Sequence, residues 1–234
     1  MIKTKVNLRS LFNQPCFLCR SEPPNSSGLC EECHADLPWL ISYCPCCAEP
    51  RSAEVPLDQP CGRCQTNPPR FDRVIAAFGY AFPLRQMIHG IKYQRRPALI
   101  GGLAATLAGL IEERCDPLPE LILPVPMHPW HETLRGFNQA ALLAEELGKR
   151  LGIPVNHRVL RKLHRTRHQA NLDRSTRATN LRGSFRVHGE LPDRIAIVDD
   201  ILTTGATANE LARCAKRAGA KEVDIWVLAR TPSN

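Results

Sequence analysis

Two acidic residues followed by a loop of small and hydroxyl residues mark a segment that suits a sugar phosphate. Residues 195–207 read IAIVDDILTTGAT, so an apolar strand ends in Asp199 and Asp200 before a helix begins. Ligands of open α/β sheets bind at the C-terminal ends of strands, and helix N-termini attract phosphate. We expect the two carboxylates to accept hydrogen bonds from a ribose diol. The phosphate would lie on the loop formed by Thr203, Thr204, Gly205, Ala206 and Thr207.

Cysteines near the N-terminus form a second chemical pattern. Eight of them make four CxxC units, separated by ten, ten and thirteen residues: Cys16, Cys19, Cys30, Cys33, Cys44, Cys47, Cys61 and Cys64. A CxxC turn offers two sulfurs to one tetrahedral ion, so four units predict two closed, structural Cys₄ zinc sites. The units could pair in order or in a cross-brace, and the short gaps slightly favour pairing in order. Cys46 is left over, and we expect it not to be a ligand.

Charge and length narrow the class of protein. The 234 residues carry a formal charge of +8, and residues 158–188 hold nine basic residues against one acid. Such a segment favours an anionic ligand, although a solvated basic loop is the alternative. No run of eighteen apolar residues occurs, so we expect no membrane insertion. The N-terminus lacks the apolar core of an export signal, which predicts a cytoplasmic protein with reduced or metal-bound cysteines.

Apolar patterning predicts two domains. Residues 1–70 are rich in Cys and Pro and have little apolar periodicity, so we expect this domain to need metal to fold. Residues 71–234 alternate between strand and helix patterns, which indicates an α/β domain with a mainly parallel sheet. The expected strands are 73–82, 120–126, 194–200 and 222–230, and the expected helices are 84–93, 98–115, 137–152 and 206–219.

Two further basic segments could bind a pyrophosphate. Residues 124–139 join a strand to a helix, and His128 and Arg135 could act there as counter-charges. Residues 165–185 are long for a structureless loop, and loops of that length often act as lids. Arg165 and Arg167 could close over the ligand, or they could be ordinary surface charges.

The segment 195–207 resembles the signature of type I phosphoribosyltransferases, which bind 5-phosphoribosyl 1-pyrophosphate (PRPP) with Mg²⁺. Together with the Cys-rich head, IHGIKY (residues 88–93), PVP…RGFNQ and the RT..Q..L motif, it makes nearly the whole chain resemble the ComF (ComF/GntX-like) family. The resemblance implies a phosphoribosyltransferase-like fold, with the catalytic Asp199 and Asp200 on the ribose hydroxyls and residues 203–207 on the 5′-phosphate. From their charge and position we expect Arg135 to act with the two acids in catalysis, and Arg165 and Arg167 to contact PRPP, unless these arginines are ordinary surface charges. It also implies a cytoplasmic role in natural competence, acting on single-stranded DNA.

Three functions follow from this resemblance. The protein could be a DNA-uptake factor that binds single-stranded DNA or a DNA-processing helicase, with PRPP as ligand. It could instead transfer phosphoribose to an unidentified acceptor, or sense PRPP without turnover. Thr203 stands where enzymes acting on 6-oxopurines carry an Asp, which disfavours purine salvage. Only 6% of the residues are aromatic, so any DNA affinity would rest mainly on phosphate contacts.

Overall fold

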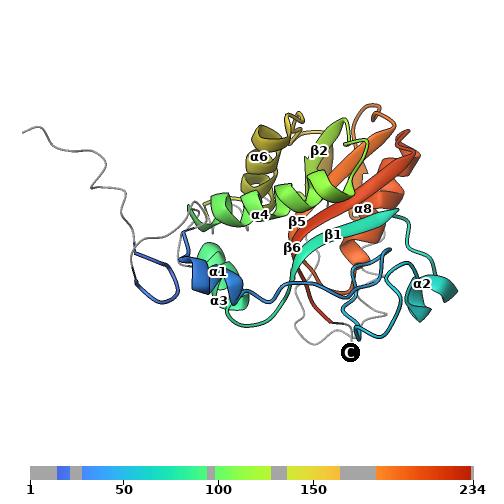
Figure 1. Cartoon of the computed structure of the whole chain (residues 1–234). Helices are drawn as coiled ribbons and strands as arrows, with labels where there is room; N and C mark the ends of the chain where they lie inside the picture. The colour runs from blue at the N-terminus through green and yellow to red at the C-terminus, as the bar shows by residue number, and fades with distance from the viewer. Residues whose placement is uncertain (1–14, 22–27, 94–97, 128–135, 164–182, 233–234) are drawn as a thin grey trace, which may run out of the picture.

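A four-stranded parallel sheet forms the centre of the molecule (Figure 1). The structure is a computed structural model that describes residues 15–21, 28–93, 98–127, 136–163 and 183–232. The strand order is β1 (Arg73–Gly79), β6 (Glu222–Arg230), β5 (Arg194–Leu202) and β2 (Leu121–Pro124). All three pairings are parallel, which confirms the predicted mainly parallel α/β architecture.

Alternate residues along the strands pack on opposite faces of the sheet. One face belongs to a core with α3 (Leu84–Tyr93), α4 (Ala98–Arg114) and α6 (Gln139–Leu151), and it includes Ala196 and Trp226. The other face packs against α8 (Ala206–Arg217). In Figure 1, α4 and α6 lie on one side of the sheet and α8 lies on the other. Both faces are covered, which explains why the strands read as nearly continuous apolar runs.

Element boundaries differ from the predicted ones in informative ways. Strand β5 continues to Leu202, because residues 199, 201 and 202 still pair with β6. The two acids therefore lie two residues before the end of the strand rather than at its last two positions, as the sequence predicted. Helix α6 begins at Gln139 because the Asn138 side chain accepts a hydrogen bond from the Ala140 backbone N–H at 3.0 Å. It ends at the predicted Gly152, whose φ of 70° favours glycine.

A short antiparallel hairpin was not expected from the sequence. Strands β3 (Leu160–Lys162) and β4 (Phe185–Val187) pair outside the main sheet. Phe185, the last residue of the expected lid segment, is buried in the core beneath α8. Each strand has three residues, too few for a clear period of two in the sequence.

The Cys-rich region contains the same turn twice. Arg20 and Ala48 each follow a CxxC unit, adopt positive φ (66° and 52°), and donate a backbone N–H to the carbonyl of the first cysteine, at 2.9 Å in both cases. Cys30 and Cys61 each then start a five-residue helix, α1 (Glu31–Ala35) and α2 (Gly62–Thr66). Each half therefore has the same local design.

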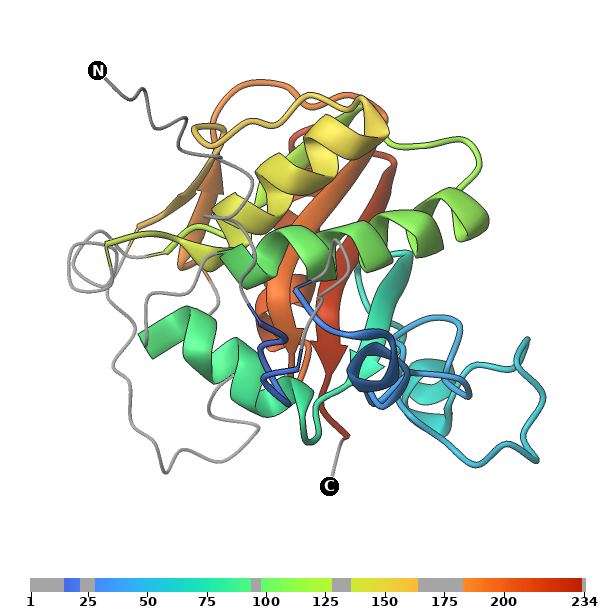
Figure 2. The same cartoon turned by 60° about the vertical axis from the view of Figure 1, so that its left-hand side comes forward.

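This Cys-rich region packs on the α/β part of the chain. Leu29 and Leu37 are buried in the core that α3 and α4 share. The Leu40 N–H donates to the Ala77 carbonyl at 3.1 Å, and the Gly79 N–H donates to the Pro38 carbonyl at 2.7 Å, which joins the region to β1. Figure 2 shows the region, in blue to cyan, along the β1 side of the molecule.

Among the described residues, no helix has both the length and the apolar character needed to cross a membrane.

Candidate functional site

A pocket of about 50 Å³ opens at the carboxyl end of β5. Asp199 lines it together with the whole predicted phosphate loop, residues 203–207. Val125, the residue that follows β2, also lines the pocket. The structure thus brings six of the predicted site residues together. Asp200 does not line this pocket.

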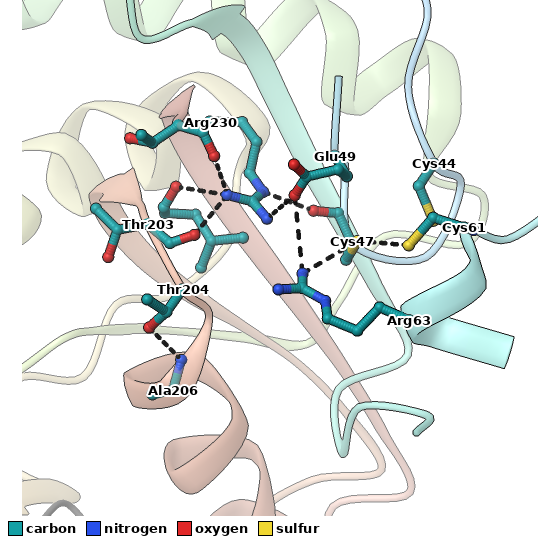
Figure 3. Close-up of polar contacts among 11 residues, drawn as sticks. Cys44, Cys47, Glu49, Cys61, Arg63, Thr203, Thr204, Ala206 and Arg230 are labelled. Carbon is teal, nitrogen blue, oxygen red and sulfur yellow. Dashed lines mark hydrogen bonds and ion pairs between the residues drawn. The ribbon is translucent and has the colours of Figure 1, made fainter. Parts of the chain in front are cut away.

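The phosphate loop is shaped by one glycine. Gly205 is the N-cap of α8 and has a φ of 78°, a conformation that residues with a Cβ rarely adopt. A Cβ at this position would meet no atom within 4 Å, so the left-handed backbone rather than crowding requires the glycine. The Ala206 N–H donates to Thr204 Oγ1 at 3.3 Å (Figure 3). Because the N-cap of α8 is a glycine, it offers no side-chain acceptor to the first N–H groups of the helix. An anion bound there would complement the positive end of the α8 dipole.

The two acids have different surroundings, because neighbouring residues of a strand point to opposite faces. Asp199 faces the loop pocket, whereas Asp200 forms an ion pair with Lys92 of α3. Burial raises the pKa of Asp199 well above its ordinary value, and the charge of Asp200 raises it further. The Asp200 N–H donates to Asp199 Oδ1 at 2.8 Å and opposes part of that rise.

Lys92 lies beside the candidate site, and the sequence did not identify it. Its Nζ lies 2.5 Å from Asp200 Oδ2, and both side chains are largely buried, at 19% and 14% exposure. Lys92 does belong to the IHGIKY stretch on which the family resemblance partly rests. No spacing in the sequence, however, connects position 92 with position 200.

Basic residues line a second and larger cavity beside β2. It has a volume of about 380 Å³, and its walls include Pro126, Arg158, Arg161 and Lys162. Burial lowers the pKa of Lys162. Because Pro124 of β2 pairs with Val198 of β5, this cavity opens next to the strand that holds the acids. Four predicted site residues lie outside the described residues: His128, Arg135, Arg165 and Arg167.

The eight CxxC cysteines form two groups of four. The first group contains the four cysteines from Cys16 to Cys33 and the second those at 44, 47, 61 and 64, and within each group all sulfurs lie within 4.8 Å of one another. The CxxC units therefore pair in sequence order. The Sγ atoms of Cys19 and Cys30 are 3.6 Å apart, and those of Cys47 and Cys61 are 3.7 Å apart. Four sulfurs at zinc–sulfur distance around a tetrahedral ion would be about 3.8 Å apart, so both groups fit Zn²⁺.

Hydrogen bonds lower the pKa of Cys16 and Cys19 in the first group and of Cys44 in the second, which favours the thiolate form. Burial opposes ionisation of Cys16, but backbone N–H groups that donate to its sulfur outweigh burial and lower its pKa to about 6. The same balance lowers the pKa of Cys44 to about 7, and the Cys61 N–H donates to its sulfur at 3.2 Å. Thiolates are the form that binds metal. Cys46 belongs to neither group, as predicted.

Comparisons with known proteins agree with this arrangement. Residues 7–65 match the model of the double zinc ribbon domain. DNA utilization protein YhgH of Salmonella typhi is 35% identical over 92% of this chain and 96% of its own length. Competence protein F of Haemophilus influenzae is 31% identical over 95% of this chain and its whole length.

Solved structures overlap with a smaller part of the chain. A purine phosphoribosyltransferase from Pyrococcus horikoshii is 24% identical, with a TM-score of 0.36 over 55% of this chain and 70% of its own. An adenine phosphoribosyltransferase from Leishmania tarentolae is 14% identical, with a TM-score of 0.37 over 59% and 73%. The full-length matches at 31–35% identity show that the chain belongs to the ComF family, that of competence protein F and DNA utilization protein YhgH.

Proposed function

We propose that this protein binds PRPP at the carboxyl end of β5 and acts on single-stranded DNA during natural transformation. One observation carries the first half: Asp199 and the loop of residues 203–207 line a single pocket at the end of a parallel strand. Hydroxyl groups, backbone N–H groups and the N-terminus of α8 suit the 5′-phosphate. The adjacent carboxylate suits the ribose diol.

The neighbouring groups complete the proposed site. Lys92 offsets the charge of Asp200, so the two adjacent carboxylates are not left to repel each other unopposed. Carboxylate oxygens such as theirs are ligands that suit Mg²⁺. When bound, the ion would offset the charge of the pyrophosphate. In the proposal Arg135, Arg165 and Arg167 act on the same pyrophosphate.

The DNA role draws on the relatives and on the basic cavity. The relatives are named for DNA utilization and for competence. Arg158 and Arg161 are exposed and line the cavity of about 380 Å³ together with Lys162. These side chains would contact the DNA backbone, which makes binding sensitive to salt. We propose that the protein works in the cytoplasm, with a DNA-processing helicase as its partner.

Two structural zinc ions form part of the proposal. Each Cys₄ group would hold one Zn²⁺ with no open coordination position, so the metal would stabilise the fold rather than react. A Cys-rich region with short helices gains much of its folding free energy from such ions.

Calorimetric titration with PRPP and Mg²⁺ tests the sugar-phosphate site. Asp199→Ala and Asp200→Ala should each lose most of the PRPP affinity of the wild type. Asp193→Ala is the matched control, because Asp193 precedes the opposite end of β5 and pairs with Lys221 at the surface. Unchanged affinity in both site variants would reject the assignment. Release of pyrophosphate with candidate acceptors then separates a transferase from a sensor.

The DNA role is tested by binding and in cells. Arg158→Gln with Arg161→Gln should weaken affinity for single-stranded DNA and reduce its salt dependence, while Lys221→Gln should change neither. A deletion strain should lose transformation and regain it with the wild-type gene. Complementation by the Asp199→Ala variant shows whether the sugar-phosphate site is needed. Normal transformation without the protein would exclude the competence role.

A further inference from the structure

The guanidinium of Arg230 joins the second Cys₄ group to the phosphate loop (Figure 3). Arg230 is the last residue of β6, and its side chain is fully buried. Its Nε donates to the Cys47 carbonyl at 3.0 Å. Its Nη1 donates to the Leu202 carbonyl at 3.2 Å and to the Thr203 carbonyl at 2.5 Å. The Arg230 guanidinium thus contacts both Cys47 of the second Cys₄ group and the first residues of the phosphate loop.

An ionic chain continues from Arg230 back to the cysteines. Arg230 also forms an ion pair with Glu49, two residues beyond Cys47. Glu49 lies 3.8 Å from the guanidinium of Arg63, which in turn lies 3.7 Å from the Cys47 sulfur. A Zn²⁺ with four thiolates would carry a net charge of −2. The two arginines therefore lie where they can offset most of that charge and the charge of Glu49.

The phosphate loop separates two cavities. On one side is the sugar-phosphate pocket with Asp199. On the other side a cavity of about 210 Å³ lies between the loop and the second Cys₄ group, with Cys64, Gly205 and Arg230 among its walls. The loop consequently has little packed support from behind. The contacts of Arg230 with Leu202 and Thr203 supply part of that support.

We infer that Arg230 is a positioning residue that makes the geometry of the phosphate loop depend on the second zinc site. This inference rests on the proposed PRPP site. Loss of the ion would free residues 44–64 and remove the Cys47 carbonyl and Glu49 from the guanidinium. A buried guanidinium cannot lose its proton and must keep partners. It would shift toward solvent. The Thr203 carbonyl would then lose the Arg230 donor, while the Leu202 carbonyl would keep the Thr231 N–H, which donates to it at 2.9 Å.

Variants at Arg230 and Glu49 test the link. Arg230→Lys keeps the charge but cannot reach both sides with a planar fork. We expect it to bind about two zinc ions and to bind PRPP about tenfold more weakly. Backbone amides of residues 203–206 should exchange hydrogen faster. Glu49→Gln keeps the Arg230 guanidinium on the loop, so it should weaken PRPP binding and speed amide exchange by less than Arg230→Lys does. This second variant still tests the inference if Arg230→Lys does not fold.

Arg73→Lys is the matched control. Arg73 lies at the opposite end of the sheet, where its Nε donates to both carboxylate oxygens of Asp224, at 2.9 and 3.0 Å. It should lower the melting temperature without changing loop exchange or PRPP affinity. Wild-type exchange and affinity in both the Arg230 and Glu49 variants would overturn the inference. If the wild type itself does not bind PRPP, the proposed function fails, and loop exchange alone still decides whether Arg230 couples the two sites.

Discussion

Lys92 of α3 and Asp200 of β5 form an ion pair with 2.5 Å between Nζ and Oδ2. The pair joins a helix on one face of the sheet to the strand that ends at the proposed sugar-phosphate site. It separates the roles of two acids that look equivalent in the sequence. Asp200 is held by a cation, whereas Asp199 faces the phosphate loop.

Removing the charge of Lys92 should weaken PRPP binding. The charge of Lys92 lowers the pKa of Asp199, so Lys92→Met should raise that pKa further and leave less carboxylate at neutral pH. We expect affinity at pH 7 to fall about tenfold and to recover in part at higher pH. Lys92→Arg should retain most of it. Equal affinity of Lys92→Met and wild type across the pH range would show that the ion pair has no role in binding.

Asp199→Asn should stabilise the protein while it abolishes PRPP binding. The pKa of Asp199 is raised in the folded state, so ionisation costs stability as the pH rises from the unfolded pKa, about 3.9, through the folded one. Above that window the variant should melt about 2–4 °C higher than the wild type. Below it the two should coincide. Asp193→Asn, at an exposed site paired with Lys221, should show no such gain in thermal scans.

The metal content should follow the two cysteine groups. We expect about two zinc ions per chain by elemental analysis. Cys44→Ser should retain about one, because the first group does not include it. Cys46→Ser, two positions away and outside both groups, should still hold two. A folded wild-type protein without zinc would contradict the assignment of both sites.

The left-handed backbone of Gly205 should make it intolerant of substitution. Gly205→Ala places a Cβ at a φ of 78° and should cost about 1–2 kcal/mol, along with PRPP affinity. Gly101→Ala is the control, since Gly101 lies in α4 and a Cβ there meets nothing within 4 Å. It should stabilise the helix by up to about 1 kcal/mol. Denaturant unfolding would measure both, and a harmless Gly205→Ala would show that the loop can adopt another shape.

Much of the fold follows from local patterns in the chain. Apolar runs such as IAIV, ended by polar or small residues, predicted the strands of the sheet because parallel strands are buried on both faces. Helix α6 begins after Asn138 and ends before Gly152, and both are residue types that commonly cap helices. The hairpin of β3 and β4 was missed, because three-residue strands owe their existence to tertiary packing around Phe185.

The sequence by itself determined which residues could do chemistry: the twin acids, the loop of threonines around Gly205, and the eight cysteines in CxxC units. Those features depend on neighbours a few positions apart. Only the tertiary structure decided that the cysteine units pair in order, that Lys92 meets Asp200, and that Arg230 bridges Cys47 and Thr203. The contacts of Lys92 with Asp200 and of Arg230 with Cys47 join residues far apart in the chain, up to 183 positions. Packing of the sheet, rather than any local spacing, brings them together.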